Sequence, residues 1–370
     1  MTRPSHRRLS SLRRRGSAVV DSSGSGGGEI ANQMRWDGES RGHYEVWYLT
    51  LNHRHSGLGV WIRYTLEAPE REHGEPYAQL WCAVFDRADP AANIAIHRRF
   101  PIGELSTDDR PFAVRIGDNE LRNDGALGVL RGDGHELRWE LSWRPASTVH
   151  HQMPSVMYRR GGLGETTVLS PNLSVPVEGS LVVDGRRYEF SGESLGQTHL
   201  WGRKHAHDWA WAHCTTFAGE QVAALECLTV RLKRMGRVLP PLTMLTLYLD
   251  GVEHRFNRLR QALSGRTTGT IASCSYTFSG RSGRLRLRGH FSCRPEDMIV
   301  APYLDPDGAP SYCANTEVGD LELVVERREG SAWVEHATLR AEGTAHFEIG
   351  GRERDPRILG DHRPVDGEPG

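Results

Sequence analysis

Residues 136–143 read Glu-Leu-Arg-Trp-Glu-Leu-Ser-Trp, so polar and apolar side chains alternate over the whole segment. Residues 284–291 repeat this pattern, with Leu285, Leu287 and Phe291 on one side. Shorter copies occur at residues 44–48 and 321–325. Successive side chains of a β-strand point to opposite faces, so the alternation puts one face on a core and the other in water. This pattern is typical of antiparallel sheets and predicts an all-β protein.

Turn signals separate these runs. Asp-Gly pairs at residues 184–185 and 250–251 suit a type I′ hairpin turn, whose central residues both need positive φ. Runs at helical spacing are scarce, and the 41 glycines and 19 prolines fit frequent turns. A chain of 370 residues is also longer than most single domains. We therefore predict two antiparallel β-barrels or sandwiches in tandem, because closure removes exposed strand edges.

The two ends of the chain differ from this middle. Residues 1–33 contain six arginines against two acids, followed by a Gly/Ser run, which predicts a disordered basic tail. Residues 356–370 are rich in proline, glycine and charge and predict a second disordered tail. Between the tails we place an N-terminal β unit at residues 34–200 and a C-terminal β unit at residues 201–355.

Composition excludes several classes of protein. The net charge of -1 argues against a specific nucleic-acid partner bound through bulk charge. No apolar run approaches the roughly 20 residues of a membrane-spanning helix, so we expect no transmembrane segment. The basic tail lacks the apolar segment of a secretory signal, which favours a cytoplasmic location. The sequence does not indicate the oligomeric state.

Residues 196–214 hold four of the 18 histidines and three of the ten tryptophans. If residues 205–213 form one strand, His205, His207, Trp209, Trp211 and His213 share a face. An aromatic face with a few polar groups suits the wall of a pocket for an apolar ligand. Asp208 would lie on the opposite face.

Three interpretations of this face remain open. The histidines could bind a metal, with His199 or His213 as third ligand, but a fourth ligand at recognisable spacing is missing, so we expect neither metal nor cofactor. The face could be an acid–base site in an apolar cavity, with His199, His207, Asp208 and Glu226 as candidate catalytic residues. Alternatively, the tryptophans belong to a core and the histidines lie at the wet ends of the strand.

Glu226 is an acid within an otherwise apolar run, in a segment predicted to pair with the tryptophan strand. The loop between them does not fix the register, so the face of Glu226 stays open. Burial in apolar surroundings would raise the pKa of Glu226 and make it an acid. A hydrogen bond to Arg203 or Arg231 would instead make it structural.

Several motifs resemble the hydroxyneurosporene synthase and tocopherol cyclase-like superfamily. They are residues 177–180 (Val-Glu-Gly-Ser), His199-x-Trp201-Gly202, Trp209-x-Trp211 and residues 343–348 (Gly-Thr-Ala-His-Phe-Glu). The resemblance implies two lipocalin-like barrels in tandem, a β-barrel fold of the calycin type, with an apolar cavity. It also implies hydration or cyclisation of isoprenoid chains by proton addition to a double bond.

The sequence thus predicts a protein that binds an isoprenoid or other lipid-like small molecule, and two functions remain open. One is hydration or cyclisation of that molecule, and the other is a non-catalytic carrier or scaffold with the same cavity. Only the enzyme needs an acid inside the pocket. The predicted ligand-binding residues are Trp201, His205, Trp209, Trp211 and His213, together with a second group from a later segment, Tyr303, Tyr312 and Asn315.

Overall fold

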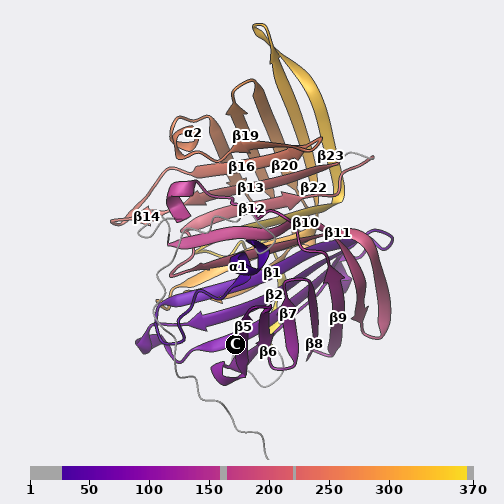
Figure 1. Ribbon diagram of the computed structural model, residues 1–370, viewed down its shortest axis with the longest axis vertical. Coiled ribbons are helices and arrows are strands. Elements are labelled where there is room, and N and C mark those ends of the chain that lie inside the picture. Colours follow the sequence, from indigo (N-terminus) through magenta and orange to yellow (C-terminus); the bar gives the residue numbers. More distant parts are fainter. Residues whose placement is uncertain (1–26, 159–164, 220–221, 365–370) are drawn as a thin grey trace, which may run out of the picture.

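A computed structural model describes residues 27–158, 165–219 and 222–364 (Figure 1). The described residues contain two short α-helices, α1 (Gly27–Asn32) and α2 (Leu259–Leu263), and are otherwise dominated by antiparallel strands. The predicted all-β class is confirmed. Most of the predicted basic tail, residues 1–26, lies outside the described residues.

One sheet contains the strands between residues 43 and 202 plus one from the C-terminus, in the order β25-β4-β3-β2-β1-β11-β10-β9-β8-β7-β6-β5. Its strands are β1 (His43–His53), β2 (Leu58–Ala68), β3 (Tyr77–Asp86), β4 (Ile94–Pro101), β5 (Leu105–Asp109), β6 (Phe112–Ile116), β7 (Asn119–Arg122), β8 (Gly125–Gly132), β9 (His135–Trp143), β10 (Thr166–Val183), β11 (Arg186–Gly202) and β25 (Arg363–Pro364).

The second sheet follows the path β17-β16-β13-β12-β23-β22-β20-β19-β18, and β21 and β24 join it beside β22. Its strands are β12 (Asp208–Cys214), β13 (Ala223–Arg231), β16 (Leu242–Leu249), β17 (Val252–Phe256), β18 (Thr267–Ala272), β19 (Ser275–Ser282), β20 (Leu285–Ser292), β21 (Ile299–Leu304), β22 (Pro310–Glu329), β23 (Ala332–Gly351) and β24 (Gly360–Asp361). A small hairpin, β14 (Lys233–Arg234) and β15 (Arg237–Val238), pairs separately. In Figure 1 the first sheet, indigo to magenta, occupies the lower part and the second, orange to yellow, the upper part.

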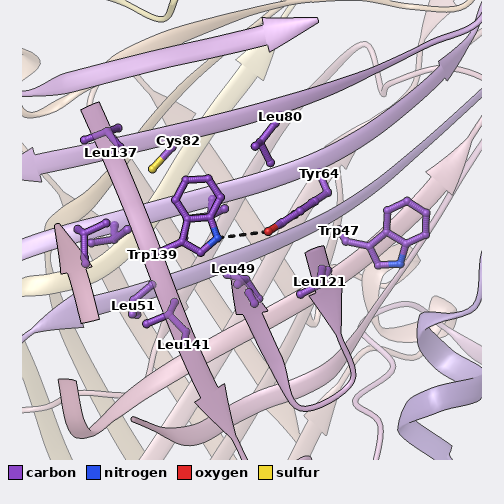
Figure 2. Packing of buried hydrophobic residues seen from close by; sticks show 14 of the residues in the cluster. Trp47, Leu49, Leu51, Tyr64, Leu80, Cys82, Leu121, Leu137, Trp139 and Leu141 are labelled. Carbon is purple, nitrogen blue, oxygen red and sulfur yellow. Dashed lines mark hydrogen bonds between the residues drawn. The ribbon is translucent and has the colours of Figure 1, made fainter. Parts of the chain in front are cut away.

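Each sheet curls around its own apolar core. In the first, Trp139 of β9 donates a hydrogen bond from Nε1 to the Tyr64 hydroxyl of β2 at 3.2 Å, across the core (Figure 2). In the second, the Tyr276 hydroxyl of β19 lies 2.6 Å from Thr229 Oγ1 of β13. Among the described residues, both strand paths end at edge strands, β25 and β5 in one sheet and β17 and β18 in the other. Two closed barrels are therefore not confirmed.

A third apolar cluster lies between the sheets and explains why β1 and β2 are buried on both faces. Trp47 and Ile62 belong to the first core, whereas Tyr48 and Trp61 turn toward the second sheet and meet Trp211 of β12 in this cluster. Such two-sided burial removes the alternation of apolar and polar residues from these strands. The contact between the sheets is where the cavity described below lies.

The chain ends depart from the predicted tails. In α1, Ala31 and Asn32 are buried, and the Asn32 carbonyl accepts a hydrogen bond from Trp47 Nε1 at 2.8 Å. After Arg354, Ile358 packs into the second core, β24 pairs with β21, and β25 pairs with β4. The prediction of disorder is wrong for residues 27–33 and 356–364, because isolated apolar side chains in these polar segments find buried positions. Residues 365–370 lie outside the described residues.

Candidate functional site

A cavity of about 120 Å³ lies between the two sheets. The first sheet contributes side chains of β1, β2, β10 and β11, and the second contributes side chains of β12, β13, β16, β21 and β23. Its wall is mainly aromatic and aliphatic, with methionines 153, 157 and 244 among the lining residues. Because methionine is flexible and polarizable, it suits the surface of an apolar ligand of irregular shape. A charged side chain is unusual in such an apolar wall, so the few that line the cavity indicate what chemistry it can perform.

Strand β12 supplies two tryptophans to the wall. Trp209 and Trp211 line the cavity, whereas Ala210 and Ala212 point into the second core, as period-two alternation predicts. The Trp209 ring lies against Gly350 of β23, where a Cβ atom would come within 2.0 Å of the ring. Glycine at this position thus allows the indole to lie flat against the neighbouring strand.

Glu348 places a carboxyl group in this aromatic wall. The β12–β23 register pairs Trp211 with Glu348, so the acid shares the tryptophan face. Trp209 Nε1 donates a hydrogen bond to Glu348 Oε1 at 2.8 Å, and Cys313 Sγ lies 3.5 Å from Oε2. Burial raises the pKa of Glu348, which favours the protonated form. Sequence analysis missed this residue as a candidate acid.

Glu226 is the second acid on this face. Strand β13 pairs Glu226 with His213 and Leu228 with Trp211, which settles the register that the sequence left open. Trp211 Nε1 donates to Glu226 Oε1 at 2.6 Å, while Oε2 has no hydrogen-bond partner among the described residues. Burial raises the pKa of Glu226 to about 8. The structural alternative, a hydrogen bond from Arg203 or Arg231, does not apply, because the donor to Glu226 among the described residues is Trp211 and Arg231 is paired with Asp208.

Glu226 makes the free energy of unfolding depend on pH. The folded pKa is about 8, whereas a glutamate in an unfolded chain titrates near about 4.3. Between these values the folded state keeps a proton that the unfolded state has lost. The stabilisation is therefore complete below the unfolded pKa and is lost as the pH rises toward the folded pKa. Within this window the group changes the free energy of unfolding by at most about 1.4 kcal/mol per pH unit.

Urea unfolding of the wild type and Glu226→Gln from about pH 4 to about pH 9 measures this dependence. We expect the stability of the wild type to fall, relative to the variant, as the pH rises through this range. His213, whose pKa is lowered to about 4 by burial, works in the opposite direction but is common to both proteins. Parallel pH profiles for the two proteins would contradict the assignment of a protonated Glu226.

His205 reaches the cavity from the loop before β12. Its Nδ1 lies 2.6 Å from Asp305 Oδ1, and its ring stacks on Tyr44, Trp209 and Tyr303 at centroid distances of 4.5, 5.4 and 5.3 Å. Burial lowers the pKa of His205, so the neutral ring is favoured. Burial acts to raise the pKa of Asp305, but hydrogen bonds from His205 outweigh it and lower that pKa. The ionised Asp305 accepts a hydrogen bond from His205 Nδ1–H, which leaves Nε2 without a proton and able to accept one.

Comparison with known proteins gives the family. The sequence profile of tocopherol cyclase-like proteins matches residues 119–351, more than half of the chain. The chain belongs to the tocopherol cyclase-like family. An uncharacterized protein of Mycobacterium tuberculosis is 29% identical to this tocopherol cyclase-like protein over 318 residues, which are 85% of this chain and 88% of the relative. The predicted superfamily resemblance is confirmed.

Solved structures share the fold of this tocopherol cyclase-like chain. An AttH-like protein from Nitrosomonas europaea superposes with a TM-score of 0.51 at 14% identity, covering 88% of this chain and 98% of its own. CghA gives a TM-score of 0.50 at 11% identity, covering 92% of this chain and 95% of its own. At these identities the likeness concerns the fold alone.

Several predicted site residues of the tocopherol cyclase-like chain lie away from the cavity. On β11, Leu200 faces the cavity, so His199 points the other way; its Nε2 lies 2.9 Å from Glu45 Oε1 and its Nδ1 2.6 Å from the Ala31 carbonyl oxygen. Trp201 shares that face and stacks under the Arg35 guanidinium. The expectation that His199 or Trp201 reaches the cavity is wrong, because strand alternation places both on the side of α1.

Other predicted residues take structural positions. Asp208 accepts a hydrogen bond from Arg231 at 2.6 Å, and the half-buried His207 lies beside Asp208 at the same end of β12. Neither lines the cavity, which corrects their predicted catalytic role. His213 is buried beside His346, with 3.1 Å between their Nδ1 atoms, and lies outside the cavity lining.

The second predicted group is divided by the structure. Tyr303 lines the cavity, whereas Tyr312 packs against the second core. Asn315 is buried and pairs with Glu348 across β22 and β23, but it does not line the cavity. Thus Tyr303, His205, Trp209 and Trp211 are the predicted ligand-binding residues that the fold brings to one place.

Metal-binding geometry is found elsewhere. Among the described residues, Glu70, Glu72 and His73 could bring three ligand atoms within 4.8 Å of one another, on a largely exposed turn before β3. Exposed acidic groups of this kind are common without an ion. In the part of the chain that the structure describes, no helix is long and apolar enough to cross a membrane.

Proposed function

We propose that this tocopherol cyclase-like protein binds an isoprenoid or other lipid-like small molecule between its two sheets and protonates one of its carbon–carbon double bonds, as a hydratase or cyclase does. The observation that carries the proposal is the Glu348 carboxyl group, which lines an apolar cavity and whose pKa burial raises. A carboxyl group whose pKa is raised keeps its proton to a higher pH than an ordinary glutamate does, and it can then serve as a general acid.

Proton transfer to an alkene needs a strong local acid and a stabilised cation. The π electrons of the double bond form a new C–H bond with the Glu348 proton, which leaves a carbocation on the neighbouring carbon and a carboxylate on Glu348. The faces of Trp209 and Trp211 line the same cavity and can stabilise the positive charge. Attack by a nucleophile within the molecule closes a ring, and attack by water gives an alcohol.

A base must then remove a proton from the product cation. His205 lines the cavity, is neutral, and has Nδ1 held by Asp305, so Nε2 can accept that proton. Exchange with solvent returns the proton to Glu348 and closes the cycle. The carrier alternative predicted from the sequence needs no such acid, and it fits a pocket in which every acid is exposed or ion-paired. Glu348, which is partly buried in the cavity wall, is neither, since among the described residues its oxygens contact Trp209 and Cys313 and no cation within 4.0 Å. Glu226 lies outside the cavity lining, behind Trp211, and is buried without an ion pair to a described residue.

Extraction of the protein purified from its own host tests the proposal. We expect mass spectrometry of the organic extract to reveal an apolar, unsaturated molecule that co-purifies with the wild type. Incubating the protein with the apolar extract of host cells in D₂O should convert that molecule into a product carrying deuterium on carbon. Binding without deuterium incorporation would support the carrier, and extracts without any bound apolar molecule would contradict both functions.

A further inference from the structure

A buried arginine lies in the wall of the cavity. On β2, Ile62 belongs to the first core, whereas Arg63 faces the second sheet and lines the cavity. Arg63 is only 3% exposed. Its guanidinium carbon lies 4.1 Å from the ring centroid of Tyr303 and 5.7 Å from that of Trp81. Aromatic faces attract a cation, but they provide no oxygen to accept its hydrogen bonds.

The described residues do not neutralise this guanidinium. No carboxylate among them forms an ion pair with Arg63 within 4.0 Å, and Arg63 Nη1 has no hydrogen-bond partner among them. Glu67 and Glu348 act on Arg63 from a longer range, but burial raises the pKa of both and favours their neutral forms. Asp305 is ionised, and His205 and Arg352 already engage its two oxygens.

A guanidinium does not lose its proton in a protein, so Arg63 remains a buried positive charge. Such a charge is unfavourable until an anion pairs with it. We propose that the ligand of the cavity carries a carboxylate that binds Arg63, while its apolar body packs against Trp209 and Trp211. This inference rests on the proposed function and narrows the substrate to an apolar molecule with an acidic head group.

The donor set favours a carboxylate over a phosphate. One guanidinium presents two parallel N–H groups, which match the two oxygens of a carboxylate. A phosphate carries more charge and is usually held by several cations or by a helix N-terminus. The other cationic side chain that lines the cavity, Lys204, is already paired with Asp307. A single negative charge thus suffices to balance Arg63.

Isothermal titration calorimetry with decanoate and decanol, which share an alkyl chain and differ in head group, tests this inference. At about pH 8 we expect the wild type to bind decanoate at least about tenfold more tightly than decanol. Arg63→Gln should lose this preference and keep its affinity for decanol within about twofold. Loss of decanol binding in Trp211→Ala would place the probe in the cavity.

Arg98→Gln is the control outside the cavity, because Arg98 also lies over an aromatic ring, Phe100, at 4.9 Å but is exposed and does not line the cavity. It should keep the preference for decanoate. Without ligand, Arg63→Gln should not melt below the wild type, because an unpaired buried charge has been removed. If Arg63 only stabilised the fold, Arg63→Gln would instead have a lower melting temperature and would lose affinity for decanoate and decanol equally.

The outcomes separate this inference from the proposed function. Two results would contradict the proposed binding of a carboxylate by Arg63: a wild type that binds decanol without preferring decanoate, or a preference that survives in Arg63→Gln. Both would still support the binding of an apolar ligand in the cavity. If neither probe binds, the proposed function fails together with the inference.

Discussion

Glu348→Gln is expected to lower the turnover of the co-purifying substrate by about 10²–10⁴-fold, the usual contribution of a general acid. Glutamine keeps the shape of the side chain and still offers an oxygen to Trp209 Nε1, which donates to Glu348 Oε1 at 2.8 Å. It cannot deliver a proton to a double bond. Binding of the substrate should therefore change little while its conversion is lost. Deuterium incorporation per molecule of protein, measured by mass spectrometry, follows the reaction directly.

Glu317→Gln is the matched control for this variant. Glu317 is buried, its pKa is also raised by burial, and its Oε2 has no hydrogen-bond partner among the described residues, yet it does not line the cavity. The control should keep most of the turnover. If Glu348→Gln stays active and Glu226→Gln does not, the acid is Glu226, which acts from behind Trp211, and the role proposed for Glu348 is wrong.

The fold class was predictable because alternation is a local property. Residues 136–143 form the greater part of β9, and the apolar members Leu137, Trp139 and Leu141 all lie in the first core. Alternation says nothing about where a sheet ends, so barrel closure could not be decided from it. Alternation also does not predict that a segment such as residues 356–364 pairs with strands far away in sequence. Ile358, an isolated apolar residue in a charged segment, was the available signal.

The candidate site was only half predictable, for the same physical reason. Trp209 and Trp211 are neighbours on one strand, so their shared face follows from period two. Glu348 joins them only through the pairing of β12 with β23, and Arg63 reaches them from β2 of the other sheet. Such pairings are non-local and depend on register, which one sequence does not determine. A signal for Arg63 was present, namely a lone arginine in the apolar run of residues 58–66.

His199 shows how proximity in sequence can mislead. It lies a few residues before the tryptophan strand, but residues 203–207 separate β11 from β12, and the two strands belong to different sheets. The side chain is instead held between α1 and Glu45, where both ring nitrogens are hydrogen-bonded. Its neighbour in the sequence motif, Trp201, shares that position. The His199-x-Trp201 motif therefore holds the N-terminal segment around α1 in place and does not contribute to the cavity.

Trp211→Ala is expected to weaken binding of decanol by more than about 1 kcal/mol, since a buried aromatic ring contributes on that scale. It should also lower the free energy of unfolding by about 3–5 kcal/mol, as removal of a buried tryptophan usually does. Two contacts explain why the Trp211 ring contributes to ligand binding and to stability. The Tyr48 ring meets the indole edge-on at a centroid distance of 5.5 Å, and the indole Nε1 donates a hydrogen bond to Glu226 Oε1. Without the indole, Glu226 would keep its buried position and lose its only hydrogen-bond donor among the described residues.

Trp139→Ala separates the loss of binding from the loss of stability. Trp139 is also almost fully buried and also donates a hydrogen bond from Nε1, to Tyr64, but it belongs to the first core and does not line the cavity (Figure 2). We expect a comparable fall in the free energy of unfolding. At matched folded fraction, decanol should bind Trp139→Ala like the wild type and Trp211→Ala several-fold more weakly. If both variants lose the probe equally, β12 is only part of the core between the sheets.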